Sequence, residues 1–283
     1  MKIYNNICEL IGNTPLVRLE KIEKKYKIPN ILVAKLEKFN PGGSSKDRIA
    51  YEIILNGLKE GKIDSKTTII EATSGNTGIG LAMVCAYFNL KLIIIMSESV
   101  TIERIKLLKL YGATVVLTKK EEGIQGAINK AQELLEKIPN NYFINQFNNN
   151  INPLAHYKTT SKELMEDLEG KINIVVAGMG SGGTITGIAK GLKEMNDNIK
   201  IIGVEPSGCP YYSKKLVGKY NIPGIGTTFM PSIVDMSLID DIMEITDEDA
   251  KKHMEMLAKE EGILVGYSSG AVLAGALEYL KIN

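Results

Sequence analysis

The sequence predicts an α/β protein in which parallel sheets are flanked by helices. Short runs rich in Ile and Val alternate with longer segments of helical character, and glycine-rich turns join several strands to the helices that follow. With 283 residues and 44% hydrophobic content, the chain is long enough to bury a substantial core in one large or two modest domains.

The expected elements form two series. Strands are predicted at 31–37, 67–72, 91–96 and 114–118, with helices at 47–61, 77–89 and 101–112. The second series has strands at 172–178 and 200–205, and helices at 184–195, at 248–262 and from Ser269 onward. Between them, the Asn-rich residues 140–157 predict a long, ordered but irregular crossing between two lobes.

Composition excludes several classes of function. The net charge of +1 gives no electrostatic signature for nucleic acid or for an anionic membrane, and no apolar run is long enough to span a bilayer. Three widely spaced cysteines predict neither a disulfide framework nor a zinc site, which favours a reducing cytoplasm. With only His156 and His253 available, we expect no catalytic metal.

Three glycine-rich segments are candidate anion sites: 40–48, 72–80 and 178–184. Each is expected to open a helix, where free backbone N–H groups and the positive end of the helix dipole favour a negative charge. The alternative for any one of them is that glycine merely permits a tight turn. Three together favour a site for several anionic groups, such as a phosphate and a carboxylate.

The third segment also permits a nicotinamide-dependent oxidoreductase. Gly178, Gly180 and Gly183 match the dinucleotide-binding pattern GxGxxG, and Glu205 closes the next strand. Glu205 is, however, farther from Gly178 than the usual spacing of about 20 residues. This interpretation also leaves the other two glycine-rich segments unexplained.

Lys46 is the candidate nucleophile, because it follows two glycines and two serines at the expected start of a helix. A helix dipole and neighbouring cations there would lower the pKa of its amine. Taken alone, a lysine is more often a solvated surface charge. A non-catalytic binding module would not need such a lysine.

The chain resembles the cysteine synthase family, which includes O-acetylserine sulfhydrylase and the catalytic core of cystathionine β-synthase, and which belongs to pyridoxal phosphate fold type II. The resemblance covers nearly the whole chain and rests on these segments in order: NTPLVRL (13–19), NPGGSSKDR (40–48), EATSGNTGIGLA (71–82), TIERIKLLKLYGA (101–113), QFNNNINPLAHYKTT (146–160), GSGGTITG (180–187) and GYSSGA (266–271).

The resemblance implies a two-lobed α/β fold like that of the tryptophan synthase β subunit, with pyridoxal 5′-phosphate between the lobes. Residues 1–37 and 146–283 would form the larger, phosphate-binding lobe, and residues 38–145 the smaller, mobile, substrate-binding lobe. It also implies a cytoplasmic homodimer that acts on a small amino acid and sulfide or a thiol.

The resemblance assigns roles residue by residue. Lys46 would carry the cofactor as a Schiff base, Asn76 would bond the ring oxygen, and Ser268, or Ser269 if the register slips by one, would face the pyridine nitrogen. The phosphate would be held by Gly180, Ser181, Gly182, Gly183 and Thr184, and the substrate by Thr73, Ser74, Gly75, Thr77, Gln146, Gly226, Thr227 and Thr228. For the Ser, Thr and Asn residues the alternative is ordinary capping and turn chemistry.

A hydroxyl rather than a carboxylate at the pyridine nitrogen favours β-replacement or β-elimination over transamination. The resemblance therefore implies chemistry through α-aminoacrylate on a serine- or cysteine-type amino acid, with O-acetylserine and sulfide as the expected pair. A lyase or hydrolase that releases hydrogen sulfide from cysteine, with serine, pyruvate or lanthionine as co-product, and a cystathionine β-synthase-like transferase are the alternatives within the family.

Residues 224–231 depart most from the family pattern. They read GIGTTFMP, where cysteine synthases typically have GIGAGFIP and cystathionine β-synthases GIGYDF. Thr227 and Thr228 would either position a nucleophile near the substrate β-carbon or be neutral changes in a loop. The chain also stops where family members usually continue into another strand, which we expect to matter more than the remaining, smaller departures. His156 falls in the crossing segment, where a lone histidine is more often a structural hydrogen-bonding residue.

Overall fold

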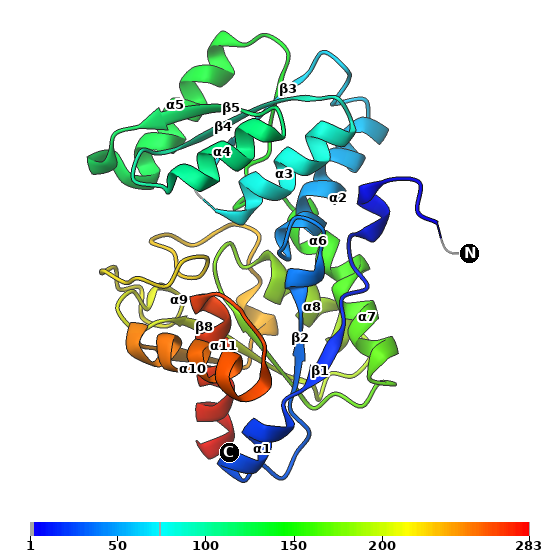
Figure 1. The fold of residues 1–283 in the computed structure, drawn as a ribbon, viewed down its shortest axis with the longest axis vertical. Helices are drawn as coiled ribbons and strands as arrows, with labels where there is room; N and C mark the ends of the chain where they lie inside the picture. Colours follow the sequence, from blue (N-terminus) through cyan, green and yellow to red (C-terminus); the bar gives the residue numbers. More distant parts are fainter. Residues whose placement is uncertain (1–2, 74, 283) are drawn as a thin grey trace. The chain divides into compact units, whose positions relative to one another are not determined.

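The computed structural model describes residues 3–73 and 75–282, and the chain packs into two compact units. Unit 1 is Met1–Gly12 with Glu37–Ile151, and unit 2 is Asn13–Leu36 with Asn152–Asn283 (Figure 1). Residues 3–12 group with unit 1, and Cys8 is buried in its core, whereas the sequence-based division placed this segment with the larger lobe. The functional division into a mobile lobe and a phosphate-binding lobe stays a prediction.

Unit 1 is an α/β sandwich built on one parallel sheet. Its strands are β3 (Thr68–Ala72), β4 (Lys91–Ser97), β5 (Thr114–Thr118) and β6 (Asn141–Phe143), in the spatial order β5-β4-β3-β6. Its helices are η1 (Ile7–Leu10), η2 (Glu37–Phe39), α2 (Lys46–Lys59), α3 (Asn76–Tyr87), α4 (Ile102–Leu110), η3 (Lys120–Glu122) and α5 (Gly123–Lys137).

The sheet of unit 1 is covered on both faces. One cluster of buried side chains joins α2 and α3 to the sheet and includes Ile53, Leu81 and Ile94. A second cluster joins α5 to the sheet through Ala127 and Ala131. Because all strand pairs are parallel, the carboxyl ends of β3 and β6 meet at one edge of the sheet, where the polar segments after both strands lie close together.

Unit 2 contains two sheets. The parallel sheet has the order β7-β8-β9, from β7 (Ile174–Gly178), β8 (Lys200–Pro206) and β9 (Asp241–Ile245), and β1 (Leu16–Arg18) pairs with β2 (Val33–Lys35) in a separate ladder. Its helices are α1 (Glu20–Tyr26), α6 (Ile151–Lys158), α7 (Thr160–Asp167), α8 (Gly183–Lys193), α9 (Tyr211–Lys214), η4 (Met236–Leu238), α10 (Asp247–Glu261) and α11 (Tyr267–Ile282).

Helices pack on both sides of the parallel sheet of unit 2. Ile185 and Leu192 of α8 belong to one buried cluster with Ile201 of β8. Ala271 and Ala274 of α11 belong to another cluster with Val204 of β8. The α/β class and the parallel sheets flanked by helices are therefore confirmed.

Two sequence-based expectations were wrong. Residues 140–157 are not one irregular crossing, since they contain strand β6 and most of helix α6. Asparagine misleads here because its side chain also satisfies backbone groups beside regular elements: Asn149 Oδ1 accepts from the N–H of Ile151, 3.0 Å away, at the start of α6. The strand expected at 31–37 is β2, but it pairs antiparallel with β1 and joins no parallel sheet.

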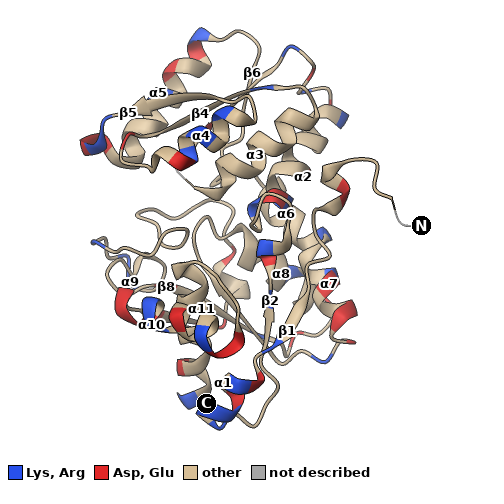
Figure 2. Cartoon of the chain, in the orientation of Figure 1, with Lys and Arg blue, Asp and Glu red and all other residues tan. Residues whose placement is uncertain are grey.

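Both signs of charge are mixed along the surface helices. Figure 2 shows Lys and Arg interspersed with Asp and Glu on α1 and α10. Such mixing leaves these helices without the single-sign surface that attracts a polyanion. No helix within the described ranges is long and apolar enough to cross a membrane.

Candidate active site

Lys46 is the first residue of α2 in unit 1, and its side chain is partly buried. Burial lowers the pKa of its amine, an effect that the Glu37 carboxylate partly offsets. No described carboxylate forms an ion pair with Lys46, since Glu37 is itself taken by Arg48 at 2.7 Å. The amine is therefore a candidate nucleophile.

The segment that precedes Lys46 is held rigidly. Arg48 donates from Nε and Nη2 to the two carboxylate oxygens of Glu37, both at 2.7 Å, which closes residues 37–48 into a loop. The Gly42 N–H donates to Asp47 Oδ2 at 2.6 Å, and the Gly12 N–H donates to Asn40 Oδ1 at 2.8 Å. These bonds fix the start of α2 and hence the position of the Lys46 backbone.

The second glycine-rich segment opens α3 of unit 1. Thr73 and Thr77 are buried, while Asn76 is exposed at the first position of the helix. The Thr77 hydroxyl donates to Gln146 Oε1 at 2.7 Å, which brings together two residues far apart in the sequence. Gly75 lies beside them, and Ser74, also assigned to the substrate, lies outside the described residues.

Gly75 leaves room in this segment. Among the described residues, its two chain neighbours aside, the atom nearest to a Cβ built on Gly75 would be the Thr73 hydroxyl oxygen, 4.0 Å away. The backbone there is extended, with φ −118° and ψ −157°, so glycine is not needed for the conformation. The free volume lies next to hydroxyl and amide groups that are able to bind a carboxylate.

The third glycine-rich segment opens α8 of unit 2. No described atom accepts a hydrogen bond from the N–H groups of residues 181–184, so four amides at a helix N-terminus have no partner within the described chain. Gly180 packs so tightly that a Cβ on it would lie 2.6 Å from the Gly224 carbonyl oxygen, and Gly182 has φ +78°. The segment has the geometry of an anion cradle.

Helix α6 supports this cradle from unit 2. Asn152 and His156 are one turn apart and fully buried. Asn152 Nδ2 donates to Ser181 Oγ at 3.1 Å, and His156 Nε2 lies 3.0 Å from Thr184 Oγ1. Sequence reasoning left His156 as a structural hydrogen-bonding residue and missed Asn152. Their spacing of four residues on one helix was the available signal.

Ser268 lies in the first turn of α11 and is partly buried. Its hydroxyl makes no hydrogen bond to any residue that the structure describes, and its Oγ is 3.8 Å from the Cβ position of Gly224. Gly224 is the residue against which Gly180 packs. Ser268 is therefore close to the cradle within unit 2, which favours it over Ser269 as the partner of a bound ring.

The two threonines of the divergent loop differ in their surroundings. Thr227 is 6% exposed, and its hydroxyl donates to the Phe229 carbonyl at 2.9 Å and accepts from the Phe229 N–H at 3.3 Å. Thr228 is exposed, and no described residue bonds its hydroxyl. Gly226, with φ +84°, joins the loop to the cradle by donating its N–H to the Met179 carbonyl at 2.7 Å.

Glu205 does not suit the dinucleotide interpretation. It is 0% exposed, and its two carboxylate oxygens accept from the N–H groups of Tyr212 and Ser213 at 2.7 and 2.9 Å. A ribose hydroxyl would have to displace these bonds inside the core. Glu205 instead holds the short helix α9, from which the Tyr212 hydroxyl donates to the Gly180 carbonyl at 2.7 Å.

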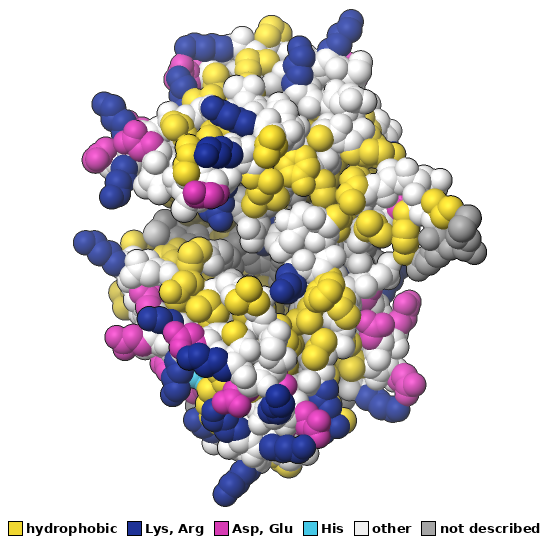
Figure 3. Space-filling view, viewed as in Figure 1, with side chains coloured by type: hydrophobic (Ala, Val, Ile, Leu, Met, Phe, Trp, Pro, Cys, Tyr) yellow, Lys and Arg dark blue, Asp and Glu magenta, His cyan; other side chains and the backbone are white. Residues whose placement is uncertain are grey.

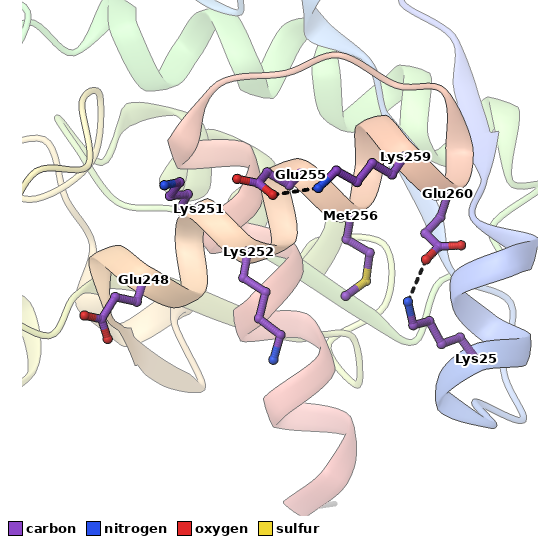
Figure 4. Close-up of a pocket in the computed structure, with 8 residues that line it drawn as sticks. All are labelled: Lys25, Glu248, Lys251, Lys252, Glu255, Met256, Lys259 and Glu260. Atoms are coloured by element: carbon purple, nitrogen blue, oxygen red, sulfur yellow. Dashed lines mark hydrogen bonds and ion pairs between the residues drawn. The ribbon is translucent and has the colours of Figure 1, made fainter.

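A shallow hollow also lies between α1 and α10 of unit 2 (Figure 4). Lys25 pairs with Glu260 at 2.6 Å and Lys259 with Glu255 at 2.9 Å across its exposed wall. Because its charges are paired and mixed in sign, we assign it no ligand. Its lining residues are Lys25, Glu248, Lys251, Lys252, Glu255, Met256, Lys259 and Glu260. Among the described residues, no cluster of His, Cys, Asp or Glu could hold a metal ion.

The donor set fits pyridoxal phosphate. The cofactor needs an amine for its aldehyde, N–H groups for its phosphate and a polar partner for its ring nitrogen. In unit 1, Lys46 supplies an amine of lowered pKa. In unit 2, residues 181–184 supply amides and Ser268 supplies a hydroxyl that have no hydrogen-bond partner among the described residues.

Comparison with known proteins gives the same assignment. Residues 7–282 match the family described as "Pyridoxal-phosphate dependent enzyme". Cysteine synthase B of Campylobacter jejuni is 46% identical over 96% of this chain and 88% of its own length. The O-acetylserine dependent cystathionine β-synthase of Bacillus subtilis is 43% identical over 99% of this chain and 91% of its own.

A solved structure agrees closely as well. The crystal structure of a hydrogen sulfide-producing enzyme from Fusobacterium nucleatum matches with a TM-score of 0.96 and 45% identity, over 100% of this chain and 93% of that one. A family match over nearly the full length, with relatives at this level of identity, establishes the family. The chain belongs to the pyridoxal phosphate-dependent enzymes and, within them, to the cysteine synthase family.

Proposed function

We propose that this protein is a pyridoxal phosphate-dependent β-replacement enzyme of the cysteine synthase type, which makes cysteine from O-acetylserine and sulfide. The observation that carries the proposal is Lys46, an amine of lowered pKa at the start of a helix with no described carboxylate as its ion-pair partner. When bound, pyridoxal phosphate supplies the electron sink that lets an amino acid lose its Cα proton and its β-substituent.

Residues of unit 1 would bind and activate the amino acid. Lys46 Nζ would hold the cofactor and, once released, accept the Cα proton, for which a lowered pKa suits it at neutral pH. Thr73, Gly75, Thr77 and Gln146 would receive the α-carboxylate in the free volume beside Gly75. Asn76, exposed at the helix start, would bond the ring oxygen, and Ser74 is assigned to the carboxylate by resemblance alone.

Residues of unit 2 would hold the cofactor. The N–H groups of residues 181–184 would bind the phosphate, with Gly180 packed beneath them. The Ser268 hydroxyl would face the ring nitrogen, where a neutral partner favours β-chemistry over transamination. Gly226, Thr227 and Thr228 would form the loop nearest the β-carbon. Because Thr227 already uses its hydroxyl within the loop, Thr228 is the better candidate to face the incoming nucleophile.

The primary test uses the purified holoenzyme and its Lys46→Ala variant. Wild type should show the visible absorption of lysine-bound cofactor and should form cysteine from O-acetylserine and sulfide. The variant should lose that absorption, and its turnover rate should be at least about a thousandfold lower than that of wild type. A wild-type protein that binds no pyridoxal phosphate would contradict the proposal.

Hydrogen sulfide release from cysteine is the second candidate. It is favoured by the 45% identity to the Fusobacterium nucleatum enzyme, described as hydrogen sulfide-producing, and by the unusual Thr227–Thr228 pair. Incubation with cysteine alone separates the two, because rapid sulfide release with serine, pyruvate or lanthionine identifies the second. Formation of cystathionine from serine or O-acetylserine with homocysteine would instead identify a cystathionine β-synthase-like enzyme, as the Bacillus subtilis relative is named.

We also infer a cytoplasmic homodimer. Cys8, Cys85 and Cys209 are all free and buried, which suits a reducing compartment. Hydrophobic side chains reach the surface of both units in Figure 3, and α4 of unit 1 exposes Ile102 and Leu110 at 54% and 85%. Light scattering should give twice the mass of the chain, and Leu110→Lys should lower that mass if α4 lies in the interface.

A further inference from the structure

Glu71 is a buried carboxylate that the proposed reaction does not use. It lies in β3 of unit 1, is 2% exposed, and forms no ion pair with any described Lys or Arg. Desolvation of an unpaired carboxylate is costly, and here it raises the pKa of Glu71 to about 8 against the opposing effect of its N–H donors. A hydrophobic residue at this position of β3, an interior strand of the sheet, would avoid this desolvation cost.

The contacts of Glu71 lead to the proposed substrate site. Its Oε2 accepts from the N–H of Asn145 at 2.9 Å, and its Oε1 accepts from Nε2 of Gln146 at 3.1 Å. Gln146 Oε1 in turn accepts from the Thr77 hydroxyl at 2.7 Å. Because β3 and β6 are parallel neighbours, Asn145 and Gln146, which follow β6, lie next to the Glu71 side chain.

Glu71 fixes the direction of the hydrogen bonds that run from it through Gln146 to Thr77. In the structure both oxygens of Glu71 accept hydrogen bonds, so the NH2 group of Gln146 faces Glu71. The carbonyl of Gln146 must then face Thr77, and the Thr77 hydroxyl must donate to it. The reverse orientation of the Gln146 amide would turn its carbonyl oxygen toward Glu71 Oε1 and its NH2 group toward the Thr77 hydroxyl, so neither observed hydrogen bond would form.

We propose that Glu71 is a positioning residue, which orients the Gln146 amide and through it the Thr77 hydroxyl so that both residues are preset to receive the α-carboxylate of the amino-acid substrate. This rests on the proposed function, because it takes Thr77 and Gln146 as the carboxylate-binding pair. In this arrangement the Gln146 amide and the Thr77 hydroxyl each have a fixed hydrogen-bond direction before the substrate arrives.

The test is Glu71→Gln, measured on the holoenzyme. A glutamine there keeps the shape but turns an NH2 group toward Gln146, which must then reverse its amide. The concentration of O-acetylserine needed for half of the visible spectral change, and the KM, should rise about tenfold, while kcat changes less than about twofold. Glu71→Asp, which keeps the carboxyl group on a shorter side chain, is measured in parallel and should show a smaller rise.

A double-variant cycle shows whether Glu71 acts through Gln146. Gln146→Ala should raise the KM by itself, and adding Glu71→Gln to it should have almost no further effect. Additive effects, or a KM for Glu71→Gln equal to that of wild type, would overturn the proposal. Glu23→Gln in unit 2 is the matched control, since Glu23 is buried at 5% exposure and bonded to Arg18, and its loss should lower the melting temperature without moving the KM.

The same experiment separates this inference from the proposed function. If the spectrum of the wild-type holoenzyme changes with neither O-acetylserine nor cysteine, the proposed function is contradicted, and so is this inference. A wild type that responds normally, beside a Glu71→Gln variant that responds at the same concentrations, contradicts the inference alone.

Discussion

The two glycine-rich turns of the candidate site carry glycine for different reasons. In unit 2 the turn before α8 is packed: a Cβ on Gly180 would meet the Gly224 carbonyl at 2.6 Å, and Gly182 has a left-handed backbone. In unit 1 the turn before α3 is open, with Gly75 in an ordinary extended conformation and free space where its side chain would be. The turn before α8 can adopt its conformation only with glycine, whereas glycine in the turn before α3 leaves space where a side chain would be.

This difference corresponds to the two kinds of ligand proposed. A cofactor phosphate stays bound through many turnovers, so its cradle gains from rigid packing and from supports such as Asn152 and His156. A substrate enters and leaves at each turnover, so its site needs reserved volume. Two buried carboxylates also differ: Glu205 in unit 2 has both oxygens bonded, whereas Oδ1 of Asp47 in unit 1 has no hydrogen-bond partner among the described residues.

Gly180→Ala should produce the largest effect. The new methyl group cannot avoid backbone atoms, so the turn must move, at a cost of about 1–3 kcal/mol in unfolding free energy. The displaced amides should weaken pyridoxal phosphate affinity by at least about tenfold. Cofactor titration by absorbance and thermal unfolding measure the two effects. Full cofactor binding at unchanged stability would show that the packing of this turn is not needed.

Gly75→Ala tests the open turn. Its backbone suits alanine, so stability should change by less than about 0.5 kcal/mol and the cofactor spectrum should be retained. The KM for the amino acid should rise about tenfold because the methyl group takes space reserved for the carboxylate. Steady-state kinetics with O-acetylserine varied at fixed sulfide is the measurement. An unchanged KM would remove the distinction between the two turns.

Asp47→Asn tests the contribution of the buried Asp47 carboxyl group in unit 1. Burial raises the pKa of Asp47 from its usual value to about 6, so its protonated form stabilises the fold at low pH and this contribution is lost as pH rises through about 6. Relative to wild type, the variant should gain about 1–2 kcal/mol of unfolding free energy between about pH 5 and pH 8. Denaturant unfolding of both holoenzymes checks this, and a difference independent of pH would contradict it.

The divergent loop should give the smallest effects. Thr227→Val removes two local hydrogen bonds from a buried site and should cost about 1 kcal/mol, without changing which nucleophile is used. Thr228→Val is the matched control, since it should leave stability within about 0.5 kcal/mol and alter only the partition between sulfide addition and sulfide release. A product ratio that responds to Thr227 and not to Thr228 would reverse this assignment.

Much of the fold could be predicted from local patterns. Runs such as KLIIIM and TTIIEA became β4 and β3 because a strand covered on both faces is predominantly hydrophobic. Strand β6 and helix α6 were missed, since the Asn-rich stretch was interpreted as a loop. Pairing with β3 and packing against the turn before α8 give these residues their structure, and neither partner is nearby in the sequence.

By itself the sequence determined the class of fold and the positions of the glycine-rich turns, and it singled out Lys46 as the candidate nucleophile, because each depends on residues within about ten positions of one another. Only the tertiary structure decided that Thr77 donates to Gln146, that Gln146 donates to Glu71, and that the hydroxyl of Thr227 is used within its own loop. The physical reason is that a hydrogen bond acquires its direction from partners that folding brings together, and a buried carboxylate reveals its role only by what it contacts.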